Sequence, residues 1–271
     1  MTATSPAPAS VDAYVRFDGI SFRYSGHETD VLSDVSLSIR RGEFFMLLGP
    51  SGCGKTTVLN LLAGFEHPTV GEVVVDGRTI ASPGPDRLVI FQGEDSLLGW
   101  LTTTENVEFG LRVAGMSARE RRERAARALQ MVGLEGQGEK YPHQLSGGMK
   151  QRVQIARALV CDADILLMDE PFAALDAQTR ATLQDELARI WEETHRTILF
   201  ITHDISEAII LGDRIGVMRA GPGSGLKEVV ANPLDRPRHR GDASFATMYA
   251  RIEQLVATEV REAMQREARW P

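Results

Sequence analysis

The chain has 271 residues and a formal net charge of −7, with 43% apolar and 25% charged residues. This length and composition are ordinary for a soluble globular protein that buries a full core as one large domain or two small lobes. The acidic balance argues against a nucleic-acid partner, no apolar run is long enough to span a membrane, and the two cysteines form neither a metal-binding spacing nor a disulfide framework.

Residues 1–12 are expected to form a disordered tail. They are rich in Pro, Ala, Ser and Thr, and they contain no basic residue and no apolar block, so they do not resemble a secretory signal. We therefore expect the chain to stay in the cytosol and to reach a membrane only through a partner.

From residue 14 onwards, strand patterns and helix patterns follow one another. The continuous apolar run EFFMLLG is typical of a central buried strand, and Gly64 ends the helix that comes after it. The elements expected up to residue 92 are strands at 15–24 and 31–39, a buried strand at 43–49, a helix at 55–63, two short strands joined by a DG turn at 71–80, and a strand at 87–92.

The middle of the chain, from about residue 103 to 132, is rich in Arg and Ala with helical spacing and predicts a helical insert. Strands are then expected at 164–170, 197–204 and 215–221, with a helix at 177–193 between the first two. This alternation favours an α/β fold, in which a largely parallel sheet is covered by helices.

The segment 243–267 predicts one final amphipathic helix. We expect its apolar stripe to cover the chain's own core, and contact with a second copy is the less favoured alternative. The stripe consists of Phe245, Met248, Ile252, Leu255 and Val256.

The sequence GPSGCGKTT at 49–57 fits the pattern G-x-x-x-x-G-K-[ST], placed between a strand and a helix. Its glycines permit a backbone geometry that points successive N–H groups at phosphate oxygens. Lys55 adds a positive charge for the outer phosphates, and Thr56 offers a hydroxyl to Mg²⁺. We interpret Cys53 as a small filler residue rather than a redox centre. The candidate nucleotide-binding residues here are Gly49, Pro50, Ser51, Gly52, Cys53, Gly54, Lys55, Thr56 and Thr57.

Polar residues close three of the expected strands: Gln92, the pair Asp169 and Glu170, and His203. In parallel sheets, ligands bind at the carboxyl ends of the strands, so these side chains are expected to meet at one site. Asp169 would hold Mg²⁺, and Glu170 would orient or deprotonate the attacking water. Gln92 would complete the Mg²⁺ shell or hold that water, and His203 would contact the terminal phosphate or hold Glu170. A solvated strand end and a structural histidine are the alternatives.

The segment LSGGMKQRVQIARAL at 145–159 resembles the signature motif of the ABC ATPase family. The resemblance extends from about residue 14 to 230 and implies that the chain binds ATP and Mg²⁺ and hydrolyses the ATP. The motifs that carry it, in chain order, are an aromatic A-loop residue at Tyr24, the Walker A loop at 49–57, the Q-loop at Gln92, the signature at 145–151, Walker B ending in Asp169 and Glu170, a D-loop at Ala174-Leu175-Asp176, and a switch histidine at His203.

The same resemblance implies the fold class and the domains. The fold is an α/β P-loop NTPase (RecA-like) with a mostly parallel sheet core, an N-terminal antiparallel β subdomain and a helical ABC-specific subdomain. The ATPase domain is expected at 13–230, with its helical subdomain at about 95–158, and residues 231–271 form a short C-terminal helical extension. Tyr24 would stack on adenine, although a strand tyrosine taken alone is more often a core residue.

The signature residues Ser146, Gly147 and Gly148 precede a helix, which makes a second helix N-terminus suited to an anion. The resemblance implies that two copies pack head to tail and that each signature closes the partner's ATP site, to which Asp176 of the D-loop also contributes. The simpler alternative is a capped helix start.

Finer features resemble the nitrate/sulfonate/taurine importer family: the segments 84–92 and 97–111, and the tail NPLDRPRHRGDASF. A motor of this kind would bind a second copy of itself and transmembrane permease subunits at the inner face of the cell membrane. It would serve a periplasmic or extracellular solute-binding protein indirectly. Gly93 and Gly99 depart from the family pattern, since a polar residue and a proline are usual there.

The segment 93–105 has two possible roles. Leu97, Leu98, Trp100 and Leu101 would suit the docking of a permease helix or burial inside the helical lobe. Two alternatives to the importer motor also remain, namely a soluble ABC ATPase that remodels a macromolecule without a permease, and the motor of another ABC transporter subfamily.

Overall fold

The computed structural model describes residues 13–91, 96–221 and 223–267. The expected tail at 1–12 and the candidate residue Gln92 lie outside this range. Four strands form an antiparallel sheet in the order β2-β1-β4-β5. They are β1 (Ala13–Phe22), β2 (Leu32–Arg40), β4 (Val70–Val75) and β5 (Arg78–Thr79).

The strand expected at 15–24 lies two residues earlier than predicted, because β1 begins at Ala13 and ends at Phe22. The chain turns at Gly26, whose φ of 83° favours glycine, and the N–H of His27 donates to the carbonyl of Tyr24 at 3.1 Å. Tyr24 therefore lies in a turn after the strand, and the placement of this tyrosine within a strand was wrong.

A second sheet has six strands in the order β10-β9-β3-β8-β7-β6. All neighbours in it are parallel except the pair β10 and β9, which is antiparallel. The sequence patterns predicted five of its strands and missed β10. The strands are β3 (Phe44–Leu48), β6 (Arg87–Ile90), β7 (Ile165–Asp169), β8 (Thr197–Thr202), β9 (Arg214–Met218) and β10 (Leu226–Ala231).

Side chains of the central strands alternate between two cores. On β3, Phe44 and Met46 join one hydrophobic cluster with the helices, whereas Phe45 and Leu47 join another with the antiparallel sheet and helix α1 (Lys55–Ala63). Because both faces are covered, the strand is apolar at every position, as expected for a central parallel strand.

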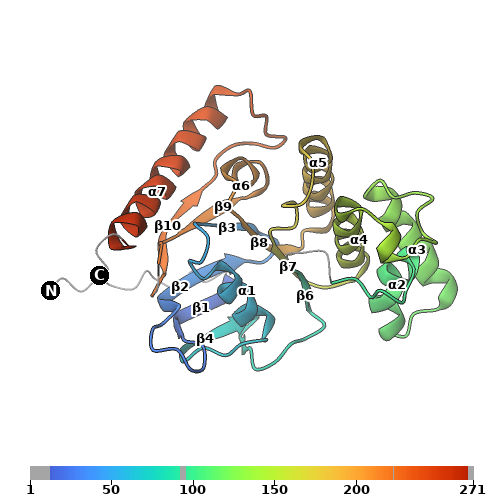
Figure 1. Cartoon of the computed structure of the whole chain (residues 1–271), viewed down its shortest axis with the longest axis horizontal. Helices are drawn as coiled ribbons and strands as arrows, with labels where there is room; N and C mark the ends of the chain where they lie inside the picture. Colours follow the sequence, from blue (N-terminus) through green and yellow to red (C-terminus); the bar gives the residue numbers. More distant parts are fainter. Residues whose placement is uncertain (1–12, 92–95, 222, 268–271) are drawn as a thin grey trace.

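The helical insert expected at 103–132 consists of two helices, α2 (Thr103–Val113) and α3 (Ala118–Met131). Gly115, with a φ of 80°, separates them. Together with α4 (Gly147–Val160) they form a lobe at the opposite end of the molecule from the long C-terminal helix (Figure 1). Hydrophobic periodicity alone did not reveal this break.

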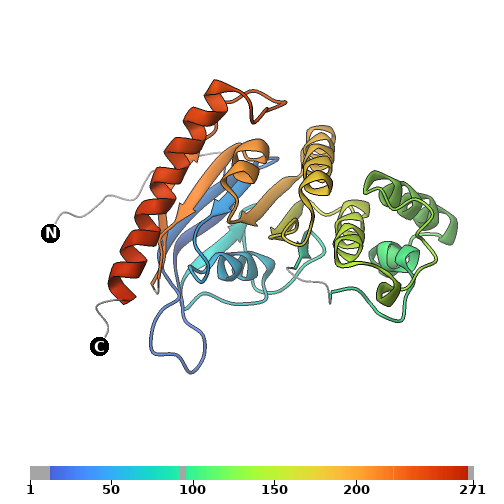
Figure 2. The same cartoon turned by 45° about the horizontal axis from the view of Figure 1, so that its top comes forward.

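The described parts of the chain also contain the α-helices α5 (Ala177–Thr194), α6 (Ile205–Leu211) and α7 (Ala243–Glu267), and a short 3-10 helix at Pro142–Gln144. The short α6 was not predicted. Helix α7 runs along the side of the six-stranded sheet (Figure 2). Its residues Phe245, Met248 and Ile252 are buried in the main core, so the helix covers its own chain as expected. None of the helices in the described parts of the chain has the length and apolarity needed to cross a bilayer.

Candidate nucleotide-binding site

The loop between β3 and α1 is organised by the side chain of Lys55. Its Nζ donates to the carbonyl oxygens of Gly49 at 2.8 Å and Pro50 at 2.9 Å, so the loop curls around the ammonium group. Gly54 caps α1 with a φ of 89°, and a Cβ atom there would lie 2.6 Å from Cδ2 of Leu32. The geometry therefore requires glycine at this position.

Cys53 packs underneath the loop. Its side chain is buried, and burial raises the pKa of its thiol. A Cβ atom at Gly49 would lie 2.9 Å from Cys53 Sγ and 2.9 Å from Met218 Cβ. The thiol thus fills the space beside Gly49, which supports the interpretation of Cys53 as a filler residue.

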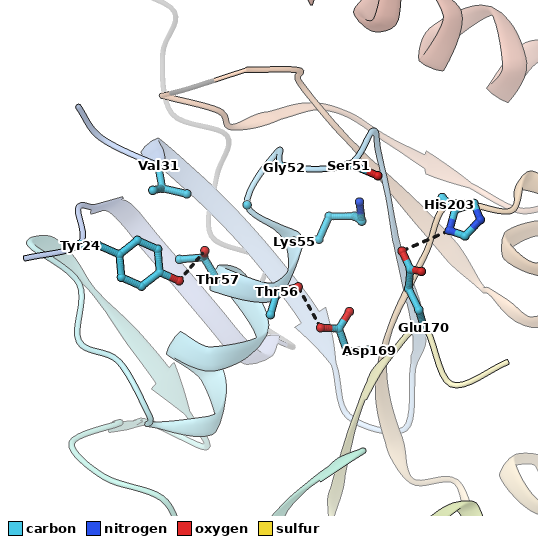
Figure 3. Close-up of a pocket in the computed structure, with 11 residues that line it drawn as sticks. Tyr24, Val31, Ser51, Gly52, Lys55, Thr56, Thr57, Asp169, Glu170 and His203 are labelled. Carbon is cyan, nitrogen blue, oxygen red and sulfur yellow. Dashed lines mark hydrogen bonds and ion pairs between the residues drawn. The ribbon is translucent and has the colours of Figure 1, made fainter. Parts of the chain in front are cut away.

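A cavity of about 510 Å³ opens above this loop (Figure 3), within the size range of small-molecule sites. The carboxyl ends of β7 and β8 meet the loop there, because β8 lies between β3 and β7 in the sheet. The cavity is lined by Tyr24, Val31, Ser51, Gly52, Gly54, Lys55, Thr56, Thr57, Asp169, Glu170 and His203.

Thr56 and Asp169 are paired at the bottom of the cavity. The Thr56 hydroxyl donates to Asp169 Oδ2 at 2.8 Å. Asp169 ends β7 and is buried, and burial raises the pKa of its carboxyl while the Thr56 hydrogen bond acts in the opposite direction. A hydroxyl and a carboxylate are the hard oxygen ligands that Mg²⁺ prefers, so this donor set fits the ion.

Glu170 sits in a strained backbone conformation directly after Asp169. Its φ is 46°, in the left-handed region that costs a non-glycine residue about 1–3 kcal/mol. The conformation is held by the bond from its own N–H to the carbonyl of Ile201 at 3.0 Å. Its carboxylate points to His203, with Oε1 3.1 Å from Nδ1 (Figure 3). Such strain is characteristic of residues whose side chain must point into a site.

An aromatic and an aliphatic side chain line the end of the cavity opposite Glu170 (Figure 3). Tyr24 Oη lies 3.3 Å from Thr57 Oγ1, and its ring meets that of Phe22 edge-on at 4.8 Å between centroids. Val31 lies beside it and was not among the predicted site residues (Figure 3). It precedes β2, and nothing in the strand pattern distinguishes it from a core residue.

The signature residues do not border this cavity. Ser146 caps α4, and its hydroxyl accepts from the N–H of Met149 at 3.3 Å. Gly147 and Gly148 form the first turn of that helix. Asp176 likewise caps α5, and the backbone N–H of Thr179 is the main cause that lowers the pKa of its carboxyl. Both motifs are therefore ordered helix starts in the single chain.

Gln151 is a site neighbour that the sequence patterns did not reveal. It is buried on α4, its Nε2 donates to the carbonyl of Glu170 at 3.4 Å, and its Oε1 accepts from the N–H of Ala174 at 3.2 Å. The side chain thus ties the signature helix to the strained turn after β7. A single glutamine on an amphipathic helix carries no sequence signal for such a contact.

Comparisons with known proteins agree with this architecture. A family model described as ABC transporter matches residues 32–173. A nitrate import ATP-binding protein of Synechococcus elongatus is 45% identical and spans 93% of this chain and 94% of that protein. A taurine import ATP-binding protein of Chromobacterium violaceum is 49% identical over 84% of this chain and 87% of that protein.

Among solved structures, a dimeric ATP-binding cassette in a post-hydrolysis state bound to ADP and Pi has a TM-score of 0.73. The two sequences are 34% identical, and the structural match covers 82% of this chain and 100% of the solved chain. The predicted fold class, a P-loop NTPase with a mostly parallel sheet core, an antiparallel β subdomain and a helical subdomain, is confirmed.

Proposed function

Because the chain belongs to the ABC transporter family and is an ATPase of that family, we propose that it is the motor subunit of an importer. The observation that carries the catalytic part of the proposal is the convergence of Lys55, Asp169, Glu170 and His203 on one cavity. The importer assignment is supported by relatives named for nitrate and taurine import.

In this proposal the residues of the cavity divide the chemistry of ATP hydrolysis. The backbone N–H groups of the loop and the Lys55 ammonium bind the phosphates, and Tyr24 stacks on the adenine. Thr56 and Asp169, with Gln92, would hold Mg²⁺, which would neutralise charge on the phosphates.

The attacking water is activated by Glu170. Its carboxylate accepts the proton as the water attacks the terminal phosphorus, and the bond to the leaving ADP oxygen breaks. His203 holds this carboxylate at 3.1 Å and so fixes the line of attack. The strained backbone of Glu170 places its side chain in the lining of the cavity, where the terminal phosphate would lie.

The site is completed by a second copy of the chain. Residues 146–148 present a capped helix N-terminus away from the cavity of their own chain, which leaves them available to a partner's nucleotide. The dimeric state of the solved cassette supports this arrangement. ATP closes the dimer and hydrolysis reopens it.

We propose that the dimer drives transmembrane permease subunits at the inner face of the cell membrane, and serves a solute-binding protein through them. Nitrate, sulfonate, taurine or a similar small anion or organic solute is the proposed cargo, which the motor does not touch. Purification of the native complex tests this directly. Copurifying permease subunits support the importer, whereas their absence favours an ATPase that acts on a soluble macromolecule.

Trp100 is the proposed docking point for the permease. Leu97 and Leu101 are buried, which agrees with burial in the helical lobe, whereas Trp100 is 74% exposed, which agrees with docking. The buried side chain of Asn106 supports the backbone on both sides of Trp100, because its Nδ2 donates to the carbonyls of Leu98 at 3.1 Å and Leu101 at 3.0 Å. A large exposed indole on a hydrogen-bonded loop suits a protein contact.

Crosslinking tests this docking surface. A Cβ atom at Gly99 meets nothing within 4 Å, so Gly99→Cys places a thiol beside Trp100 without strain. We expect disulfide or bifunctional crosslinks to the cytoplasmic loops of the permease. Gly241→Cys, equally open but in the C-terminal extension, is the control. An active complex that yields no Gly99→Cys crosslink would exclude this surface.

A further inference from the structure

The segment between β10 and α7, residues 232–240, lies across the C-terminal end of α6 and is called the strap (Figure 1). Asn232 Nδ2 donates to the carbonyl oxygens of Ile209 at 2.8 Å and Gly212 at 2.9 Å. Arg238 Nη1 donates to the same two carbonyls at 2.9 and 2.7 Å. Two strap residues therefore hold the same end of one helix.

The strap places two arginine side chains, Arg236 and Arg238, at the C-terminal end of α6. Arg236 Nη2 donates to the carbonyl of Leu211 and to Asp213 Oδ1 at 3.0 Å, and its guanidinium lies 4.4 Å from the centroid of the Trp191 ring. Burial lowers the pKa of Arg238 to about 10, which leaves its guanidinium charged at neutral pH. Cations at a helix C-terminus satisfy unpaired carbonyls and interact favourably with the helix dipole.

The other end of α6 begins beside the catalytic cavity. His203 is followed by Asp204, whose Oδ1 accepts from the N–H groups of Ser206 at 2.7 Å and Glu207 at 3.1 Å and so caps the helix. A helix of seven residues has little stability of its own, so its position depends on what holds its two ends. The cap fixes one end next to His203, and the strap fixes the other.

A second connection runs from the strap through buried side chains. Arg240 Nη2 donates to Gln184 Oε1 at 2.9 Å, and Gln184 Nε2 donates to Glu207 Oε1 at 3.2 Å. The Thr202 hydroxyl donates to Glu207 Oε2 at 2.7 Å and accepts from the N–H of Asp204 at 3.0 Å. Gln184, Glu207 and Thr202 are almost fully buried. This series of hydrogen bonds ends at Thr202 and Asp204, the residues on either side of His203.

We propose that Arg238 and Arg240 are positioning residues for His203, through which the strap sets the rate of ATP hydrolysis without contacting nucleotide. The inference rests on the proposed role of His203 in holding Glu170. A strap that shifts lets α6 move and takes the His203 imidazole away from the Glu170 carboxylate. The C-terminal extension is thus a control point for turnover.

The test uses Arg240→Ala in the full-length protein. Arg240 is exposed, and its loss removes only the first hydrogen bond of the series, the one to Gln184. We expect kcat for ATP to fall about three- to tenfold, with KM for ATP and the thermal midpoint nearly unchanged. Arg240→Lys keeps a donor for Gln184 and should recover much of the rate.

The matched control is Arg251→Ala. Arg251 pairs with Glu228 of β10 at 2.9 Å, so its loss removes an arginine from the same extension without removing a bond to α6. We expect this variant to retain the parent kcat. Arg238→Ala removes hydrogen bonds to α6 directly and should lower kcat further. If Arg238→Ala folds poorly, the comparison of Arg240→Ala with Arg240→Lys decides the test.

Histidine NMR supplies a readout that a purely structural role would not move. With histidines labelled at Cε1, and the His203 signal assigned through His203→Gln, Arg240→Ala should shift that signal while Arg251→Ala should not. An unmoved His203 signal, or a kcat in Arg240→Ala equal to that of the parent, overturns the inference. If His203→Gln itself hydrolyses ATP at the parent rate, the proposed role of His203 fails instead.

Discussion

Two regions of this chain are proposed to bind phosphate, and they differ in completeness. The cavity half, formed by residues 49–57 with Asp169, Glu170 and His203, encloses about 510 Å³ and brings charge, hydroxyl and carboxylate groups together. The signature half, residues 146–148, is a capped helix start that borders no such cavity. In the described parts of the chain, the first half lines a cavity and the second half does not border it.

The difference supports the proposal that the first half binds nucleotide within its own chain and the second half binds the nucleotide of a partner. Strain and tight packing are concentrated in the cavity half, where Gly49 and Gly54 have no room for a Cβ atom and Glu170 has a positive φ. At Gly148 a Cβ atom would lie 3.4 Å from Leu175 Cδ2, which is ordinary contact. A glycine that its own chain does not require is better explained by a partner that approaches closely.

The largest expected effect within the cavity half comes from removing Glu170, the proposed general base. Glu170→Gln keeps the shape of the side chain but cannot accept a proton, so turnover should fall about 10²–10⁴-fold. ATP binding should persist, and the dimer should accumulate on gel filtration with ATP. Steady-state phosphate release measures the first effect. Hydrolysis at the parent rate would show that Glu170 is not the base.

Lys55→Ala should act earlier, on binding itself. Removing the charge that the loop encloses should weaken ATP affinity about ten- to a hundredfold, measured by calorimetry on the purified chain. The exposed Lys140, changed to Ala, controls for the loss of a positive charge. Equal affinities for the two variants would contradict the assignment of Lys55 to the phosphates.

Alanine at two glycines sharpens the contrast between the halves. Gly49→Ala clashes with Cys53 and Met218, so it should lower the thermal midpoint and weaken ATP binding. Gly148→Ala fits its own chain and should leave both unchanged, yet lower turnover about tenfold because the methyl group meets the partner's nucleotide. Unchanged turnover in Gly148→Ala would argue against a close approach there.

The smallest effect concerns the thiols. Burial raises the pKa of both Cys53 and Cys161, so each of these thiols loses its proton at a higher pH than the thiol of a free cysteine does. A disulfide reagent at pH 8 should therefore leave Cys53 of the folded chain unmodified, whereas both thiols should react in denaturant. Rapid modification of native Cys53 would show that the loop opens.

Much of the fold could be predicted because local patterns determine it. The apolar runs of β3, β7 and β8 are buried at every position, and α1 begins at Lys55 and ends at Ala63 as its glycines indicated. Strand β10 was missed because most of its residues are half buried and show no alternation. Helix α6 was missed because seven residues are too few for a periodic pattern.

The residues that line the cavity could be predicted in part from the sequence, but their geometry could not. The loop and the strand ends at Asp169 and His203 were visible in the sequence, and the sheet order brings them to one cavity. The positive φ of Glu170 and the bonds of Gln151 depend on packing between distant segments. Nothing in the residues around Gln151 specifies that packing.

The measurement that tests the central claim most directly is complementation between two defective copies. Lys55→Ala damages only the cavity half, and Ser146→Arg adds bulk at an exposed residue of the signature half. Each variant alone should hydrolyse ATP poorly. If each ATP site is shared between two copies, mixing them restores one intact site in every mixed dimer, so phosphate release should rise well above the sum of the separate rates. A mixture no faster than that sum, or full activity of Ser146→Arg alone, would contradict a site built from two chains.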